Sequence, residues 1–211
     1  QNFEENRENG ENESYICSLI RQDSIIEFVS YVNRINLSLS SKIKSSIYET
    51  NSFLIGKNPS LIEYAAFFGS IQIFQYLRLN GVELNSSLWL YVIHSNNAEL
   101  IHLLEENNVI PENNNYQKCF DESIKCHHND IANYIENRYL IIQNNTNSNY
   151  QLIFDENIVW LIYHYCNYSY FPEYFCKSFG FFYLNKYKYN KVVELYIQEK
   201  RNEIETEIII K

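Results

Sequence analysis

Side chains that could bind a metal or act as nucleophiles gather at one place in the sequence. Cys119, Cys126, His127 and His128 lie within one short stretch. Zinc sites usually take their ligands in pairs two to four residues apart, on turns. Here the two cysteines are at positions i and i+7, and no second ligand pair follows. Because these positions share one face of a helix, the spacing favours two buried cysteines that act as small hydrophobic side chains.

A cysteine nucleophile with a histidine base would have to use the same residues. Such a pair needs a third group that orients the base, and a pocket of donors for the oxyanion. The surrounding pattern supplies no such pocket, and we interpret His94 and His102 as structural or surface side chains. We therefore predict a non-enzymatic chain without catalytic, cofactor-binding or metal-ligating residues. A cysteine- or metal-dependent enzyme is the alternative from another functional class.

The segment 177–191 combines lysines with tyrosines and contains no acidic residue. Its lysines and tyrosines are Lys177, Lys186, Lys188, Lys191, Tyr183, Tyr187 and Tyr189. Lysines beside stacking rings are typical of surfaces that bind single-stranded nucleic acid. The simpler interpretation is an amphipathic helix pair with a basic solvent face, since the net charge of −9 opposes binding to phosphates. Nucleic-acid or anionic-surface binding is therefore the alternative function.

The elements around these residues follow a helical pattern that is clearest in 60–85. Ser60, after Pro59, is a suitable N-cap, and Gly69 and Gly81 are suitable stops after a first and a second short helix. The apolar positions of the two helices are Leu61, Ile62, Ala65, Ala66, Ile73, Phe74, Tyr76 and Leu77. The spacing predicts a helical hairpin whose small alanines allow a neighbouring helix to approach closely.

The same layout returns twice further along the chain. A copy 27 positions later puts Asn96 and Asn108 at the two glycine positions. A third copy, offset by 31, puts Ser123 and Ile124 at the alanine positions and His127 at the turn. Asparagine and histidine are among the residues that best tolerate positive φ. The matching backbone requirements predict an array of repeated hairpins.

Residues 60–85 resemble an ankyrin repeat in the alanine pair, Gly69, Ile73-Phe74, Tyr76-Leu77 and the ending 81–85. The region of about 15–140 is similar to a divergent ankyrin-like domain family of unknown function that is abundant in protists with AT-rich genomes. The copies depart from the regular pattern, since 60–63 reads Ser-Leu-Ile-Glu in place of Thr-Pro-Leu-His and the spacing is shorter than the usual ~33 residues. The resemblance implies an all-α solenoid of stacked antiparallel helix pairs with irregular or shortened turn fingers.

The resemblance also implies a function, a protein–protein interaction scaffold that binds a partner protein on its concave face. In such repeats the residues after the alanine pair tend to face the concave side. The expected partner-binding residues are Phe67, Phe68, His94, Ser95 and Lys125. The alternative for one of the two phenylalanines is that its ring packs between neighbouring repeats.

The remaining segments complete the expected domain organisation. Residues 1–13 carry five glutamates against one arginine, so they are expected to form a disordered acidic tail. Residues 14–58 are expected to form N-terminal capping helices, with a helix pair over 15–34. Residues 59–140 are expected to form the ankyrin-like repeats. Residues 150–211 are expected to form degenerate C-terminal helical repeats.

The expected location follows from the cysteines and from the lack of long apolar runs. Five cysteines form no paired framework, which indicates a reducing compartment, and we expect an intracellular, cytoplasmic protein. No run approaches the ~18 apolar residues of a membrane span. The chain begins with Gln1 and contains no methionine, so we expect that its natural start is missing.

Overall fold

The computed structural model describes residues 3–140, 158, 160–162, 164–170, 194 and 198. These residues form helices and turns without a strand, and an isolated bridge pairs Lys42 with Ser60. The expected all-α class is confirmed for this part of the chain. Within it, no helix has both the length and the apolar character needed to cross a membrane. The chain divides into two compact units, 1–114 and 115–211, and each is described by itself.

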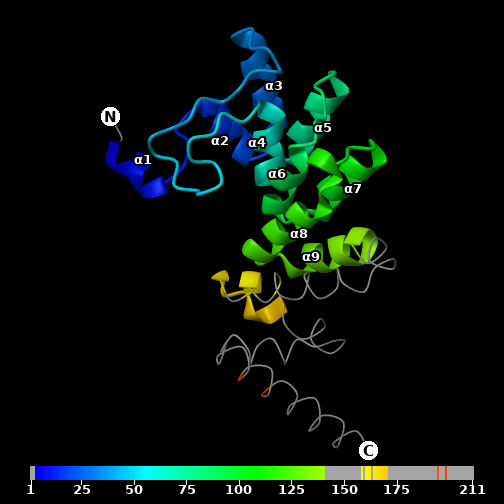
Figure 1. Ribbon diagram of the computed structural model, residues 1–211. Helices are drawn as coiled ribbons and strands as arrows, with labels where there is room; N and C mark the ends of the chain where they lie inside the picture. Colours follow the sequence, from blue (N-terminus) through cyan, green and yellow to red (C-terminus); the bar gives the residue numbers. More distant parts are fainter. Residues whose placement is uncertain are drawn as a thin grey trace, which may run out of the picture. The chain divides into compact units, whose positions relative to one another are not determined.

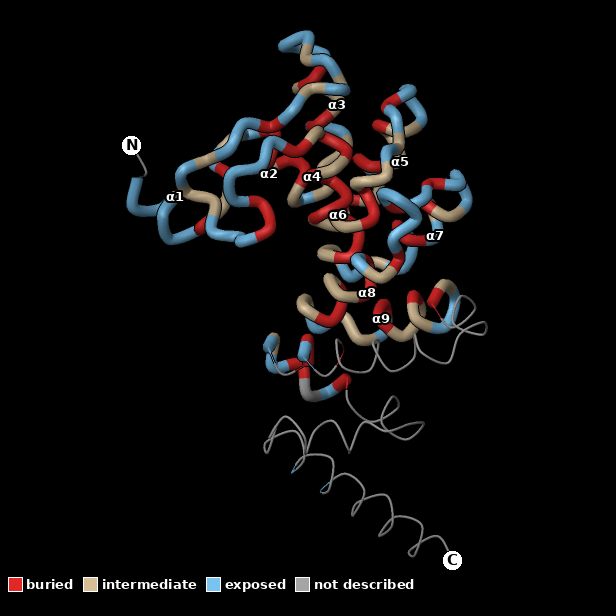
Figure 2. The backbone as a smooth tube through the Cα atoms, viewed as in Figure 1, coloured by how far each residue is buried: buried red, intermediate tan, exposed pale blue. Residues whose placement is uncertain are grey.

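Helical hairpins lie side by side in the first unit. Its helices are α1 (Phe3–Asn9), α2 (Tyr15–Arg21), α3 (Ile25–Arg34), α4 (Leu61–Phe68), α5 (Ile71–Leu79), α6 (Leu88–Ser95) and α7 (Ala98–Glu106). Short turns join α2 to α3, α4 to α5 and α6 to α7. Helix α2 packs against α4, α4 against α6, and α3 against α5 (Figure 1). Figure 2 shows that buried residues follow the row of first helices, α2, α4 and α6.

The second unit begins with a hairpin of the same kind, α8 (Tyr116–Lys125) and α9 (Asn129–Ile135). A π-helical turn over Glu136–Leu140 follows directly. Residues 158, 160–162 and 164 are also helical, and a 3₁₀ turn spans Tyr168–Tyr170. The Tyr170 hydroxyl donates to Glu136 Oε2 at 2.9 Å, which fixes this turn beside the end of α9.

The turns have the backbone conformation that the repeat pattern predicts. Positive φ occurs at Gly69 (71°), Asn96 (51°) and His127 (60°), between the helices of each pair, and at Gly81 (82°) and Asn108 (55°) after the second helices. The same inter-helix position is occupied by Asp23 (50°), in the helix pair expected over 15–34, and by Cys166 (55°), which the pattern did not identify. Glycine adopts this conformation without strain, and asparagine tolerates it better than most residues.

At four of the inter-helix turns in the described residues, the residue after the positive-φ residue closes the preceding helix through one backbone bond. Its N–H donates to the carbonyl five residues earlier: Ser24 to Leu19 (3.0 Å), Ser70 to Ala65, His128 to Ser123 and Asn167 to Ile162 (each 2.9 Å). This bond satisfies a carbonyl that the helix end would leave unpaired. Its recurrence at 166–167 shows that the same helix ending exists beyond the copies recognised in the sequence.

A capping box begins α4, as the sequence predicts at Ser60. The Ser60 N–H donates to Glu63 Oε2 at 2.7 Å, and the Glu63 N–H donates to Ser60 Oγ at 3.4 Å. The equivalent Ser87 does not cap α6; its hydroxyl donates to Glu63 Oε1 instead. The Glu63 carboxylate therefore connects the starts of two neighbouring first helices.

The predicted disorder of residues 1–13 is wrong for the described residues from Phe3 onward. Helix α1 occupies most of this stretch, and the Gly10 carbonyl accepts from both the N–H (3.0 Å) and Oγ1 (2.9 Å) of Thr50. Asn12 is buried, and its Nδ2 donates to the Lys44 carbonyl at 2.9 Å. Composition indicates disorder because it counts charges; it does not register these bonds to a segment more than thirty residues away.

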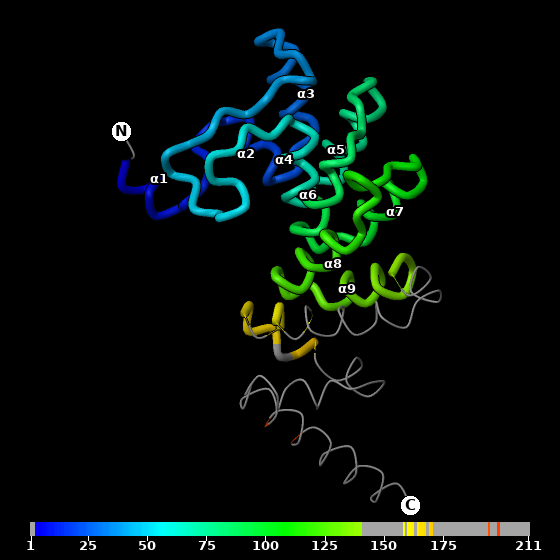
Figure 3. Tube along the Cα trace, in the orientation of Figure 1, coloured from blue at the N-terminus to red at the C-terminus, as the bar shows by residue number. Residues whose placement is uncertain are grey.

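The partner of that N-terminal stretch is the irregular segment between α3 and α4. Figure 3 shows that this segment runs beside α1 and then returns to α4. The apolar run over 53–55 predicts packing under the first clear repeat; Phe53 and Leu54 are buried as this requires, but Ile55 is 56% exposed.

Candidate functional site

Four of the five predicted partner-binding residues lie at the ends of two packed helices. Phe67 and Phe68 end α4, and His94 and Ser95 end α6. The ring centroids of Phe67 and His94 are 5.1 Å apart, so the structure brings these two helix ends together. Lys125 ends α8 in the second unit, where its Nζ lies 3.1 Å from Glu122 Oε1.

Phe67 is buried, at 8% exposure, so in this structure a partner cannot reach its ring directly. The ring of Phe53 covers it, with centroids 5.8 Å apart and planes 12° from parallel. Phe67 thus follows the alternative reading, a ring that packs between elements, and its cover comes from the irregular segment that precedes α4.

Phe68 keeps part of its ring accessible. It is half-buried, with its centroid 4.7 Å from Tyr64 and 5.0 Å from Phe67. The guanidinium carbon of Arg21 lies 5.9 Å from the Phe68 centroid, within the range of a cation–π contact. A half-covered ring beside a cation can still accept a partner side chain on its open part.

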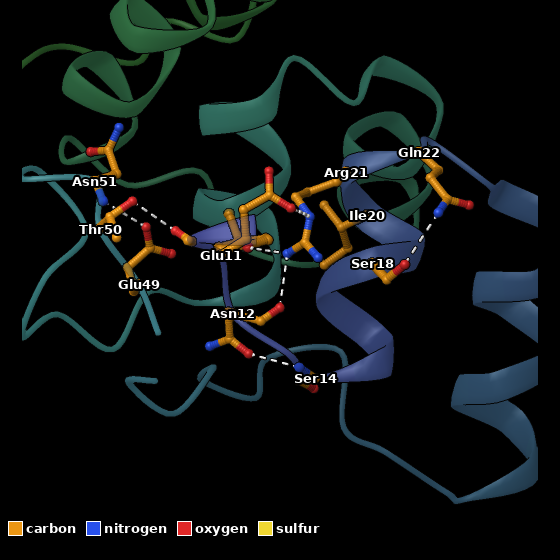
Figure 4. A network of polar contacts seen from close by, with 12 residues as sticks. Glu11, Asn12, Ser14, Ser18, Ile20, Arg21, Gln22, Glu49, Thr50 and Asn51 are labelled. Carbon is orange, nitrogen blue, oxygen red and sulfur yellow. Dashed lines mark hydrogen bonds and ion pairs between the residues drawn. The ribbon is translucent and has the colours of Figure 1, made fainter. Parts of the chain in front are cut away.

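Arg21 is fixed by several contacts at once (Figure 4). Its Nη1 donates to the Asn12 carbonyl at 3.0 Å and to the Tyr64 hydroxyl at 2.9 Å. Its Nε lies 2.8 Å from Glu11 Oε2, and burial raises the pKa of the Tyr64 phenol. The arginine therefore ties the N-terminal stretch to α4 and holds its charge beside Phe68.

Sequence reasoning missed the side chains that complete this site. We define the α4–α6 aromatic face as Phe67, Tyr91 and His94. Phe53 contacts all three rings, and Lys57 Nζ lies 3.2 Å from the Phe53 centroid. The only signal in the sequence was the apolar run that begins at Phe53, inside a segment with weak periodicity.

The cysteine and histidine stretch has structural roles in the second unit. Cys119 is 1% exposed inside α8, which agrees with a small hydrophobic side chain, and Cys126 follows the helix. His127 occupies the positive-φ turn, and its Nε2 donates to the Tyr165 carbonyl at 2.9 Å in the tautomer that protonates this nitrogen. His128 directly precedes α9.

Alkylation of the folded chain should label Cys166 and spare Cys17 and Cys119. Cys166 is exposed, whereas burial raises the pKa of Cys17 to about 11 and of Cys119 to about 12. Near pH 8 a rise of about 2 units lowers the reactive thiolate fraction by about 100-fold. Peptide mass mapping after iodoacetamide treatment measures each site, and denaturing urea should make all of them react. Equal labelling of Cys119 and Cys166 in the folded chain would contradict the burial described here.

The basic segment 177–191 lies outside the described residues, so the alternative of nucleic-acid binding stays a sequence prediction. The same holds for most of the expected C-terminal repeats over 150–211. Comparison with protein-family models, with curated proteins and with solved structures found no match to this chain.

Proposed function

We propose that this chain is a non-enzymatic protein-binding scaffold built from ankyrin-like helical repeats. Its partner is a protein that contacts the C-terminal ends of α4 and α6 and the turns that follow them. Stacked helical pairs present the ends of successive first helices in a row, and repeat proteins use such rows as extended binding surfaces. The ankyrin-like character is itself part of the proposal and is supported by the alanine pair, the turn conformations and the helix endings.

A bond that recurs between neighbouring pairs supports the repeat architecture. In the first unit, Ser70 Oγ donates to the Ile20 carbonyl at 2.5 Å. In the second unit, Asn167 Nδ2 donates to the Ile124 carbonyl at 2.8 Å. Both donors directly follow a positive-φ residue, Gly69 or Cys166. Both acceptors lie three residues before the positive-φ residue of the preceding pair, Asp23 or His127. The same register in two units is expected from a repeated structural element and not from unrelated hairpins.

The observation that carries the binding role is the half-buried ring of Phe68. Tyr64, Phe67 and Arg21 all contact this ring, with centroid distances of 4.7, 5.0 and 5.9 Å. Aromatic and arginine side chains are enriched at protein interfaces, and a side chain that is already held in place loses less entropy on binding. Phe68 and Arg21 together meet that description.

Replacing Phe68 with alanine should weaken capture of the partner by at least about five-fold, because an interface anchor contributes more than ~1 kcal/mol. Affinity capture from native cells with the tagged chain, quantified by mass spectrometry, measures the effect. Phe3→Ala is the matched control, since Phe3 is also a phenylalanine and is 58% exposed on α1. If the Phe68→Ala variant keeps its helical content and captures the partner as well as the parent chain does, the assignment of the partner-binding surface to the ends of α4 and α6 is contradicted.

A further inference from the structure

The turn from Asn51 to Lys57, which we call the Phe53 turn, satisfies its own backbone. The amides of Leu54 and Ile55 donate to the Asn51 carbonyl at 2.9 and 3.0 Å, and the Lys57 amide donates to the Leu54 carbonyl at 3.0 Å. The Phe53 amide donates to Asn51 Oδ1 at 2.9 Å. Because these four amides are paired inside the turn, they contribute no hydrogen bond to α4 or α6.

Side chains attach the turn to the α4–α6 aromatic face. The Phe53 centroid lies 5.8 Å from that of Phe67, 5.0 Å from that of Tyr91 and 4.1 Å from that of His94. Lys57 Nζ stands 3.2 Å from the Phe53 centroid and 5.7 Å from the Tyr91 centroid. One phenylalanine ring, covered by an ammonium group, therefore bridges the first helices of two neighbouring hairpins.

Apart from Phe53 and Leu54, the residues of the turn are exposed. Leu54 is its second buried side chain, whereas Ile55 is 56% exposed. Gly56 has φ +73°, and a Cβ added there would meet no atom within 4 Å. A segment with only two buried apolar side chains and without regular secondary structure belongs to the part of a protein that opens at a lower free energy than global unfolding.

The negative charge of Glu63 near the aromatic face favours binding of a cation. Burial raises the pKa of the Tyr91 phenol to about 12, and the negative charge of Glu63 adds to this rise. A carboxylate at the start of α4 thus acts on the same ring that Lys57 approaches. A binding segment with an aromatic side chain followed by a basic one would therefore complement the rings of the face and the negative charge of Glu63.

We propose that the α4–α6 aromatic face is a docking site for a protein segment that presents an aromatic side chain and, four residues later, a basic one. The Phe53 turn is the intramolecular occupant that this segment displaces. The displaced turn would uncover Phe67, Tyr91 and His94 next to Phe68. This inference rests on the proposed scaffold function and names the chemistry of its partner.

A synthetic peptide of residues 49–58 with a fluorescent label is the probe, and anisotropy measures its binding to the full chain. The tethered turn competes at an effective concentration in the millimolar range. The peptide should therefore bind the Phe53→Ala chain at least about ten-fold more tightly than the parent chain. The same peptide with Phe53→Ala should lose this binding, and the peptide with Lys57→Glu should bind several-fold more weakly. Equal binding to both chains, or none to a Phe53→Ala chain with parental helical content, would overturn the docking site.

Hydrogen exchange on the unmodified chain keeps the proposal testable if the Phe53→Ala chain does not fold. The amides of Leu54, Ile55 and Lys57 should exchange at least about 100-fold faster than the core amides of α4 and α6. Equal protection would show that the turn opens only on global unfolding, and would overturn displacement. If the peptide test or the exchange test fails while Phe68→Ala still weakens capture of the partner, the docking site is rejected and the scaffold function stands. If instead Phe68→Ala leaves capture unchanged, the surface assigned to the scaffold is rejected.

Discussion

Replacing Trp89 with alanine should lower the free energy of unfolding by about 3–5 kcal/mol, the range for removal of a large aromatic side chain from a core. Trp89, in α6, is fully buried, and its Nε1–H donates to the Val109 carbonyl at 2.8 Å. The side chain thus joins α6 to the chain that follows α7. Because folded domains are stable by only about 5–15 kcal/mol, this single change should remove a large fraction of the total.

Urea unfolding followed by far-ultraviolet circular dichroism measures this loss. The second tryptophan of the chain supplies the control, since Trp160 is 49% exposed and Trp160→Ala should change stability by less than about 1 kcal/mol. Trp89→Phe should lie between the two, because it keeps most of the ring but leaves the Val109 carbonyl without its indole donor. Similar midpoints for the Trp89→Ala and Trp160→Ala chains would contradict the packing of α6.

The helices and turns of the hairpins could be predicted because their signals are local. In each of the three copies a residue type that tolerates positive φ occupies the turn, and this property together with the repeat spacing predicts Gly69, Asn96 and His127. Cys166 has the same backbone conformation but is not a residue type typical of it. The pattern therefore missed the turn that Cys166 forms. A turn can be predicted from the sequence only where its residue type is typical of positive φ.

The irregular parts of the first unit could not be predicted because distant groups determine them. Arg21 holds Glu11 and Asn12, and Thr50 holds Gly10, through bonds that no periodicity marks. The burial of the residues in the candidate site also depends on distant groups. Repeat geometry identified the helix ends correctly, but the burial of Phe67 depends on a ring from a segment outside the repeat. Only the three-dimensional structure shows which of two adjacent phenylalanines stays accessible.

A buried amide links the helical residues near 160 to α8 in the second unit. Asn167 is fully buried, and its Nδ2 lies 2.8 Å from both the Ile124 carbonyl and Asn129 Oδ1. Its Oδ1 accepts from the Ser169 hydroxyl at 3.1 Å. The asparagine therefore satisfies a helix-end carbonyl that is otherwise shielded from water, as Ser70 does in the first unit.

Asn167→Ala should therefore lower the free energy of unfolding of the second unit by about 1–3 kcal/mol, the cost of leaving a buried polar group without a partner. Urea unfolding measures the loss, and faster amide exchange of His128, whose N–H closes the same helix end, should accompany it. Ser169→Ala is the control, because Ser169 is exposed and water can replace its bonds. If both variants lost the same stability, the Asn167–Ile124 bond would not hold the turn at Cys166 against α8. The agreement in register with Ser70 would then be coincidental, and the case for a repeat in the second unit would rest on α8 and α9 alone.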